Sequence, residues 1–508
     1  MSVKTKHLIR VICFLLIFAL LFLGAQRILQ SKWDTFGTNG DKYIVQQFNS
    51  LKKNSVELAI MGSSQAVQGV SSMRFLEAHQ ISAFSTAGAI QPTDCMYYYT
   101  KQLLKKQQLK AVLIDTSMLF EEPLERGFRR VSDFIPFSAD KMELILNYSR
   151  YNLANKGSGS AVRKFWSYMF PIMQFHDRWE ELGKSDFTDE GASPFVFRGN
   201  TSLFKRVPQD LEKILVDDKE ADPDLKYDDY ELTYFRKTLD ALQKAGVKTV
   251  LFKTPKTSWT RAHYEGAQAI ADEYGLDYID FNLREYYEAA GIDGATDFSD
   301  RDHLNYHGSF KLTDYLAEYL KAQVSFTPAV PDAAEQKRLE VFHRYNIAAD
   351  LIMTNDISEL IASADQEGFE LLVQIDAGSE LPEALRAALS DAGLHVDTAG
   401  ADGQNYIARV SGGTLVHEQQ SGGMITYDAV MEGEDALNTV HIESDAGKKG
   451  VIQLNGSDIK LKSRGAHILA YAPEWAASMR VTTITSQEDG SIVLADSALP
   501  TPTTEEEA

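Results

Sequence analysis

Strand-like apolar runs alternate with amphipathic stretches over the first two thirds of the chain. The strand-like runs lie at residues 56–61, 81–88, 110–115, 247–253 and 276–281. The helix-like stretches lie at residues 72–78, 97–106, 231–245, 262–274 and 309–323. Continuous apolar runs are typical of strands buried on both faces, and strands that alternate with helices build a mostly parallel sheet. The pattern therefore predicts an α/β domain, which we place at residues 55–325.

This alternation is interrupted between about residues 120 and 229. Aromatic, proline and charged residues are mixed there without a clear period. The segment is predicted to be a large insertion over one end of the sheet. Segments carried by a rigid scaffold often shape a substrate cleft, and we expect this one to do so.

A second change of pattern divides the chain after residue 325. Pro328 and Pro331 indicate a linker, which we extend over residues 326–364. Beyond it, one strand and one helix precede short alternating segments, which predict a β-rich α+β domain over residues 365–495. The acidic tail at residues 496–508 cannot bury a core and is expected to be disordered.

The N-terminal pattern predicts a transmembrane anchor over residues 1–27. Basic residues, the last of them Arg10, precede an uncharged run at residues 11–26. This run is shorter than the ~20 residues of a spanning helix. Leu8 and Ile9 extend it if the side chain of Arg10 reaches back to the membrane surface.

The basic flank of this segment stays inside the membrane, so the rest of the chain is expected outside it. The first part of that exterior portion, residues 28–54, is predicted to be a polar stalk. A cleaved signal peptide remains the alternative, because the small residues at the end of Leu23-Gly24-Ala25 could form a cleavage site. No clean cleavage site is present, which favours a retained single-pass anchor.

Composition and charge narrow the class of protein. A chain of 508 residues is too long to fold around one compact core, so two or more domains are expected. The net charge of −21, from 51 basic and 72 acidic residues, argues against nucleic acid as a partner. Cys13 and Cys95 cannot build a disulfide framework, and no His-x-x-x-His or comparable cluster indicates a metal. We expect neither a metal nor a cofactor.

Two short motifs carry candidate chemistry. The turn Gly62-Ser63-Ser64 follows the first apolar run, where a serine hydroxyl is exposed beside backbone N–H groups. His303 is poised to act as its base near neutral pH, and Asp300 lies three residues earlier on the same loop. Asp300 can hold the imidazole tautomer and stabilise the imidazolium. The three residues together predict a Ser-His-Asp triad.

The Gly-Ser-Ser turn and the Asp-x-x-His segment are each common in turns and surface loops. Only their occurrence together, each after a strand, favours catalysis. Asp302 is the alternative acid, although its side chain is expected to point away from an inward-facing His303. His307 is a second candidate base, but a residue at the start of a helix is the simpler interpretation.

The same residues resemble the SGNH (GDSL-like) hydrolases over about residues 55–325. The family places its nucleophile in a Gly-x-Ser turn after a strand, which here is Ser64, and its base in Asp-x-x-His before the last helix, which here is Asp300 to His303. The resemblance implies a three-layer, flavodoxin-like domain. It also implies an oxyanion hole formed by the backbone of Ser64 and by Gly88.

One block departs from the family pattern. SGNH hydrolases often carry Gly-x-Asn-Asp after the third strand, and the asparagine donates to the oxyanion. This chain has Asp115-Thr116-Ser117 instead, so Ser117 is the candidate third donor. A lost oxyanion donor costs about 10²–10³ in rate, which is compatible with a slow hydrolase or a transferase.

The segment from His303 to Gly308 looks like the form found in bacterial surface-polysaccharide members of the family. The resemblance therefore implies ester chemistry on a cell-surface polysaccharide or teichoic-acid-like polymer, as in polysaccharide O-acetylation and teichoic-acid D-alanylation. It also implies a multipass membrane O-acyltransferase as partner. The alternative from another class is a catalytically silent glycan-binding or assembly protein that works with such an enzyme. The sequence leaves open the acyl group, the polymer, and hydrolysis versus transfer.

Two further candidates concern substrate binding. His176, Arg178 and Trp179 could line a sugar subsite in the insertion, and a packed structural cluster is the alternative. Lys253 ends a strand at the expected active edge of the sheet and could contact an anionic substrate, with a solvated lysine as the alternative.

The C-terminal domain has a resemblance of its own. Residues 449–459 and 463–471 look like parts of the interleukin-like EMT-inducer domain, over a region of about residues 365–490. That resemblance implies a β-rich module that is not known as a catalyst. Related stem domains bind glycans, and a structural spacer is the alternative.

Overall fold

The computed structural model describes most of the chain and divides it into two compact units. The described residues are 3–30, 40–156, 158–187, 196–217, 225–366, 368–397, 399, 403–432, 437–445, 447–471, 479–486 and 492–497. The first unit is Met1–Phe342 and the second is His343–Ala508. The division falls within helix α16 (Ala333–Met353).

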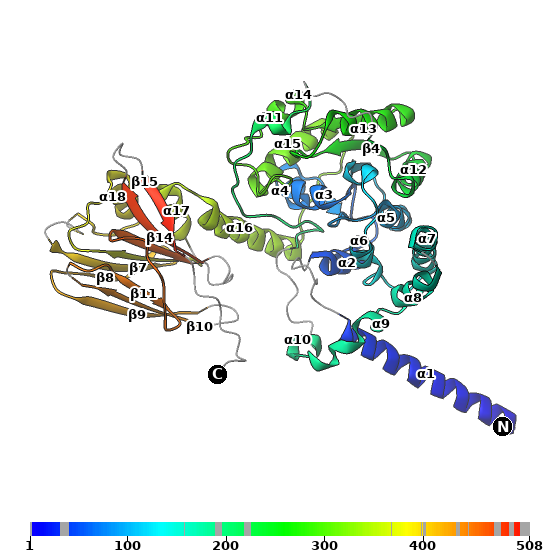
Figure 1. The fold of residues 1–508 in the computed structure, drawn as a ribbon, viewed down its shortest axis with the longest axis horizontal. Helices are drawn as coiled ribbons and strands as arrows, with labels where there is room; N and C mark the ends of the chain where they lie inside the picture. The colour runs from blue at the N-terminus through cyan, green and yellow to red at the C-terminus, as the bar shows by residue number, and fades with distance from the viewer. Residues whose placement is uncertain are drawn as a thin grey trace. The chain divides into compact units, whose positions relative to one another are not determined.

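A five-stranded parallel sheet forms the centre of the first unit (Figure 1). Its strands are β1 (Leu58–Met61), β2 (Ala83–Ser85), β3 (Ala111–Asp115), β4 (Lys248–Lys253) and β5 (Asp277–Asp280). Their order across the sheet is β2-β1-β3-β4-β5, and every neighbouring pair is parallel. The predicted parallel α/β sheet is therefore confirmed. In such a sheet the order reverses between β1 and β3, and ligands bind at the carboxyl ends of the strands there.

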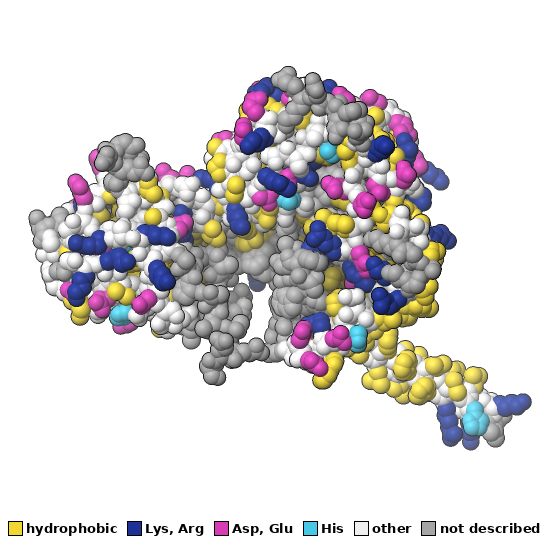
Figure 2. All heavy atoms as spheres, viewed as in Figure 1, with side chains coloured by type: hydrophobic (Ala, Val, Ile, Leu, Met, Phe, Trp, Pro, Cys, Tyr) yellow, Lys and Arg dark blue, Asp and Glu magenta, His cyan; other side chains and the backbone are white. Residues whose placement is uncertain are grey.

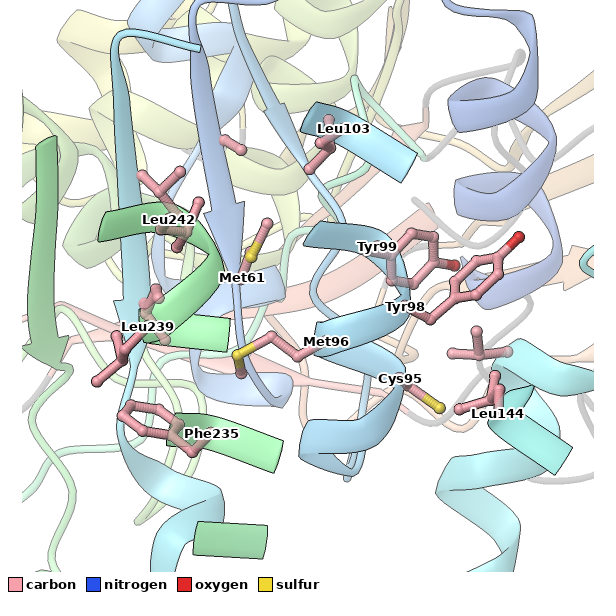
Figure 3. Close-up of a cluster of buried hydrophobic side chains, with 14 of the residues drawn as sticks. Met61, Cys95, Met96, Tyr98, Tyr99, Leu103, Leu144, Phe235, Leu239 and Leu242 are labelled. Atoms are coloured by element: carbon pink, nitrogen blue, oxygen red, sulfur yellow. The ribbon is translucent and has the colours of Figure 1, made fainter. Parts of the chain in front are cut away.

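Helices cover both faces of this sheet because successive strand residues point to opposite sides. One face packs Ala59 and Met61 of β1 against α5 (Thr93–Lys106), α12 (Asp229–Lys244) and α13 (Arg261–Tyr274). Figure 3 shows Met61 among Met96 and Leu103 of α5 and Leu239 and Leu242 of α12. The other face packs Leu58 and Ile60 against α3 (Ser64–Gly69), α4 (Ser72–His79) and α15 (Tyr306–Lys321). Three layers result.

The segment between β3 and α12 is largely helical, in the region predicted to be an insertion. It begins with the 3-10 turn η1 (Ser117–Phe120). Its further elements are α6 (Glu125–Ser132), α7 (Ala139–Lys156), α8 (Ser158–Met169), α9 (Ile172–Phe175), the 3-10 turn η2 (His176–Glu180), α10 (Lys184–Phe187) and α11 (Leu211–Ile214). A short helix, α14 (Arg284–Ala289), follows β5.

The predicted stalk and linker both contain packed helices. Residues 40–50 of the stalk form α2 (Gly40–Ser50), whose Ile44, Val45 and Phe48 are buried in the cores of the first unit. The linker contains α16 and α17 (Ile357–Ala364). In the described parts of both segments, short apolar stripes on these helices pack against a core.

In the part of the chain that the structure describes, one helix, α1 (Val3–Leu29), is long and apolar enough to cross a membrane. Its mean hydropathy over the best window is 2.8, and none of that window is buried. A membrane anchor and a signal sequence share these properties, so the structure identifies an apolar N-terminal helix of one of these two kinds.

The second unit is built from two antiparallel sheets, as its alternating pattern predicts. The larger has the order β15-β14-β13-β6-β7-β8 and the smaller β12-β11-β10-β9. The strands are β6 (Glu370–Ile375), β7 (Asn405–Ser411), β8 (Thr414–Ser421), β9 (Ile425–Glu432), β10 (Leu437–Ser444), β11 (Val451–Leu454), β12 (Ser457–Asp458), β13 (Ala466–Tyr471), β14 (Met479–Ser486) and β15 (Ile492–Asp496).

The two antiparallel sheets share a core. Leu372 and Leu469 of the larger sheet are buried with Ile442 and Ile452 of the smaller one. Helices α17 and α18 (Glu383–Asp391) pack on each other, and α17 also contacts β6 and β13. The predicted acidic tail lies outside the described residues beyond Ser497.

Candidate active site

Ser64 lies at the carboxyl end of β1, in a sharp turn between the strand and α3. Gly62 makes this turn with φ +143°, a value that side chains rarely allow. Ser63 is the N-cap of α3, and its hydroxyl oxygen accepts a hydrogen bond from the Gln65 N–H at 3.2 Å. Ser64 therefore begins the helix, and its side chain is half-buried beside the loop that carries His303.

A chain of hydrogen bonds joins Ser64, His303 and Asp300. Ser64 Oγ lies 2.8 Å from His303 Nε2, and His303 Nδ1 lies 3.0 Å from both carboxylate oxygens of Asp300. A carboxylate only accepts, so Nδ1 carries the ring proton and leaves Nε2 free to accept the Ser64 proton. The three residues predicted as a triad are thus brought together with the spacing that the chemistry requires.

The loop around His303 is held by its own backbone. Phe298 and Leu304 form an antiparallel bridge, and Ser299 N–H donates to the His303 carbonyl at 2.9 Å. Asn305 then caps α15 by accepting from Gly308 N–H. The tight loop between the bridge and the helix explains how an acid and a base three residues apart face each other.

Asp300 is suited to remain ionised beside His303. Partial burial pushes the pKa of Asp300 up, but the hydrogen bond from His303 and the N–H groups of Asp302 and His303 outweigh it. The net result is a pKa below the ordinary value of this carboxyl group. Asp302, the alternative acid, instead accepts from Ser258 Oγ at 3.0 Å and contacts Arg301.

We expect Asp300→Asn to lower kcat for ester cleavage by about 10²–10⁴, because the amide can donate to Nδ1 and favour the wrong imidazole tautomer. Its carbonyl oxygen can keep the backbone hydrogen bonds, so the fold should survive. The measurement is the rate of p-nitrophenyl acetate cleavage against pH. Asp302→Asn is the matched control and should stay close to the wild-type rate; the opposite ranking would make Asp302 the acid.

The predicted oxyanion donors are only partly available. The Ser64 N–H, at the start of α3, donates to no group in the described part of the chain. The Gly88 N–H donates to the Gly62 carbonyl at 3.2 Å. The Ser117 hydroxyl and N–H both donate to Asp115 Oδ1, at 2.7 and 3.3 Å. Gly88 and Ser117 thus lie near the turn, but both have other partners in this state.

A buried carboxylate, Asp115 at the end of β3, holds the serine turn in place. Its Oδ2 accepts from the Ser63 N–H at 3.2 Å and from the Ser63 hydroxyl at 2.7 Å. With the two bonds from Ser117 on Oδ1, the carboxylate accepts four hydrogen bonds while only 1% exposed. Asp115 thus fixes the residue next to the candidate nucleophile.

Lys253 is not available to a substrate, and the expectation that it is exposed is wrong. Its side chain is fully buried, and its ammonium donates to the Gln65 side-chain oxygen and the Thr254 carbonyl, both at 3.0 Å. Burial lowers the pKa of Lys253 to about 8, although the attraction of Asp115 at 4.0 Å opposes the change. Lys253 is a structural cation beneath the site.

Gln65 connects this buried lysine to the loop that carries His303. Its side-chain oxygen accepts from Lys253 and from the Thr254 hydroxyl, and its amide donates to the Asp302 carbonyl at 2.6 Å. The residue beside Ser64 therefore holds the residue beside His303. Sequence reasoning missed Gln65 and Asp115; polar residues directly after apolar strands were the available signal.

The close approach of the serine turn to Asp115 makes Gly62 sensitive to substitution. A Cβ at Gly62 would lie 2.5 Å from Asp115 Cβ, and the backbone has a positive φ. We expect Gly62→Ala to lower the free energy of unfolding by about 2–4 kcal/mol and to displace Ser64. Urea denaturation measures the first effect. Gly246→Ala is the control, because Gly246 has a positive φ and nothing lies within 4 Å of the new Cβ. It measures the cost of backbone strain without a steric clash.

The structure does not bring His176, Arg178 and Trp179 to Ser64. All three lie in η2, where Arg178 donates to the Leu29 carbonyl and to Asp186, both at 2.8 Å. They therefore lie beside the C-terminal end of α1, close to α9 and α10 (Figure 1). A sugar subsite at these residues stays a prediction, and it would be separate from the triad.

Among the described residues, no group of three or more His, Cys, Asp or Glu side chains is arranged to hold a metal ion. No protein-family model matches the chain, and no curated protein matches it. Function is therefore inferred from the geometry of the site.

Proposed function

We propose that the chain is a membrane-anchored serine esterase or acyltransferase of the SGNH type that works outside the membrane. The observation that carries the proposal is the hydrogen-bonded series of Ser64, His303 and Asp300 at the carboxyl edge of a parallel sheet. The strand order of that sheet is the flavodoxin-like one that the SGNH resemblance implies.

The reaction follows from the positions of these groups. Ser64 Oγ attacks the acyl carbonyl as His303 Nε2 takes its proton, and the tetrahedral oxyanion forms beside the Ser64 N–H. His303 then gives the proton to the departing alkoxide, which leaves an acyl ester on Ser64. Water or a sugar hydroxyl, deprotonated by His303, attacks that ester and restores Ser64.

The substrate class rests on the resemblance of the segment from His303 to Gly308 to surface-polysaccharide enzymes. The proposed substrate is an acyl ester of a cell-surface polysaccharide or teichoic-acid-like polymer. In the transfer reaction a membrane O-acyltransferase supplies the acyl group. The apolar helix α1, with its basic inner flank, would anchor the chain beside such a partner.

A catalytically silent glycan-binding protein is the second candidate, and the bonded state of the oxyanion donors favours it. An oxyanion hole with more than one donor requires the Gly88 N–H to leave the Gly62 carbonyl, or Ser117 to leave Asp115. The C-terminal β-rich unit would then serve recognition alone.

The test is covalent labelling of the full chain in detergent with a fluorophosphonate probe, read by mass spectrometry of the modified peptide. The proposal predicts a single adduct on Ser64 and release of p-nitrophenol from p-nitrophenyl acetate. A chain that melts cooperatively yet stays unlabelled and inactive would support the silent binding protein. Adding a sugar hydroxyl to the acylated protein then separates hydrolysis from transfer.

A further inference from the structure

Large apolar side chains are exposed on the part of the insertion that adjoins α1. They are Val162 (62%), Trp166 (47%), Met173 (47%), Trp179 (64%) and Phe187 (65%). They come from α8, α9, η2 and α10, and the last three of these elements contact α1 directly. In Figure 2 the apolar side chains of α1 continue onto the adjoining surface of the unit. Apolar patches of this kind mark an interaction site rather than an ordinary soluble surface.

A series of aromatic contacts links α1 to this surface. Phe18 stacks on Phe22 within α1, with ring centres 6.2 Å apart. Phe22 meets the edge of Phe170 at 5.6 Å, and Phe170 stacks on the exposed Trp166 at 6.0 Å. The apolar face of α1 is thus continuous with Trp166 through packed rings.

The depth at which this contact occurs is set by the length of α1. The helix is exposed up to Leu21, and the unit begins to cover it at Phe22. Phe22 lies twelve positions after Arg10, which is about 18 Å along a helix. The hydrocarbon core of a bilayer is about 30 Å thick. If Arg10 marks the inner boundary, the elements that touch Phe22 therefore lie within the outer part of the bilayer.

We propose that residues 158–187 form an interfacial membrane-binding element that inserts these apolar side chains into the outer boundary of the bilayer that α1 spans. Trp166 and Trp179 suit that position, because indole rings concentrate at membrane–water interfaces. An interfacial element of this kind buries its apolar face about 5–10 Å below the headgroups. With about 18 Å of the roughly 30 Å core behind it, Phe22 lies about 12 Å from the outer boundary, just below that layer. The proposal rests on the anchor role of α1.

The occupant of the surface is lipid, since the surface continues an apolar helix that is itself exposed over its whole inner length. The first unit is then attached to the bilayer at two places, α1 and residues 158–187. Two attachment points fix the orientation of the first unit on the bilayer.

The test uses the full chain reconstituted into phosphatidylcholine–phosphatidylglycerol vesicles that carry a diazirine-labelled phospholipid. After illumination, mass spectrometry maps the lipid adducts along the chain. We expect adducts on α1 and on residues 158–187. Adducts on α1 with none on residues 158–187 would overturn the proposal, and would indicate a face kept for a membrane protein, which these vesicles lack.

Two variants sharpen the result. Met173→Glu combined with Trp179→Glu should reduce adducts on residues 158–187 several-fold and leave those on α1 unchanged, because charge is excluded from the acyl region. Val416→Glu, at a residue 53% exposed on the second unit, is the matched control and should change neither. An unchanged adduct pattern in the double variant contradicts the proposal.

The anchor itself is tested separately. The mass of the N-terminal peptide of the chain taken from cell membranes shows whether α1 is retained. Loss of residues 1–25 would remove the anchor role and with it the basis of the interfacial element. Ser64 labelling would be untouched by either result, so the esterase proposal is decided independently.

Discussion

Ser64→Ala is expected to lower the rate of ester cleavage by roughly 10⁴-fold or more and to abolish fluorophosphonate labelling. The alanine removes the atom that attacks the acyl carbonyl, and neither His303 nor Asp300 can replace it. The fold should be preserved, because the hydrogen bond of the Ser64 hydroxyl among the described residues is to His303, on a half-buried loop. The measurement is the initial rate with p-nitrophenyl acetate beside a thermal melt of the same sample.

Ser63→Ala is the matched control, since it removes a hydroxyl from the neighbouring residue. The Ser63 hydroxyl donates to Asp115 and accepts from Gln65 N–H. Its loss should lower the free energy of unfolding by about 1–3 kcal/mol, while the rate stays within tenfold of the wild type. If Ser63→Ala abolished labelling and Ser64→Ala kept it, the nucleophile would be Ser63.

Asp115→Ala is expected to lower the free energy of unfolding by about 3–5 kcal/mol, the largest stability effect that we predict. Four donors of Ser63 and Ser117 lose their acceptor, and the buried Lys253 loses the carboxylate 4.0 Å away. Urea denaturation monitored by tryptophan fluorescence measures the change. A change below 1 kcal/mol would mean that water reaches these donors.

The same prediction has a pH dependence and a double-variant control. The pKa of Lys253 is lowered by burial to about 8, so the wild-type lysine is cationic below that pH and neutral above it. The loss from Asp115→Ala should therefore be largest below pH 8 and should shrink as the pH rises through 8. Adding Lys253→Met removes the buried cation, and the double variant should be less destabilised than the sum of the single ones.

Local patterns were sufficient to predict the parallel sheet, and they singled out three residues that lie within hydrogen-bonding distance of one another. The strands at β1, β3 and β4 are apolar runs of strand length, and runs of this kind pair in parallel when helices separate them. Ser64, Asp300 and His303 each lie in a short motif, and the end of a strand is visible in the sequence. Their approach in space follows from the parallel direction of the strands.

The sequence alone could not predict which side chains meet where distant strands end. Lys253 ends β4 as a surface lysine would, and only the packing of Trp259 and Gln65 around it shows that it is buried. The Gly88 N–H was predicted to donate to the oxyanion. Its hydrogen bond to the Gly62 carbonyl joins two backbone groups, so the residue types do not reveal it. The helix α2 was predicted as part of a stalk because its apolar stripe is short and lies among polar residues.

The separation of Ser64 and His303 by 239 residues has a consequence for biogenesis. If the part of the chain after α1 crosses the membrane in sequence order, as proposed, the serine turn emerges long before the loop at residues 298–304. Helix α15, which packs on α3 and α4, comes later still. Because domains complete their folding only when their last elements are available, the half-exported chain holds a serine without a base. On the proposed function, acyl chemistry begins only once residue 304 has emerged, and we expect a chain truncated before that residue to be inert.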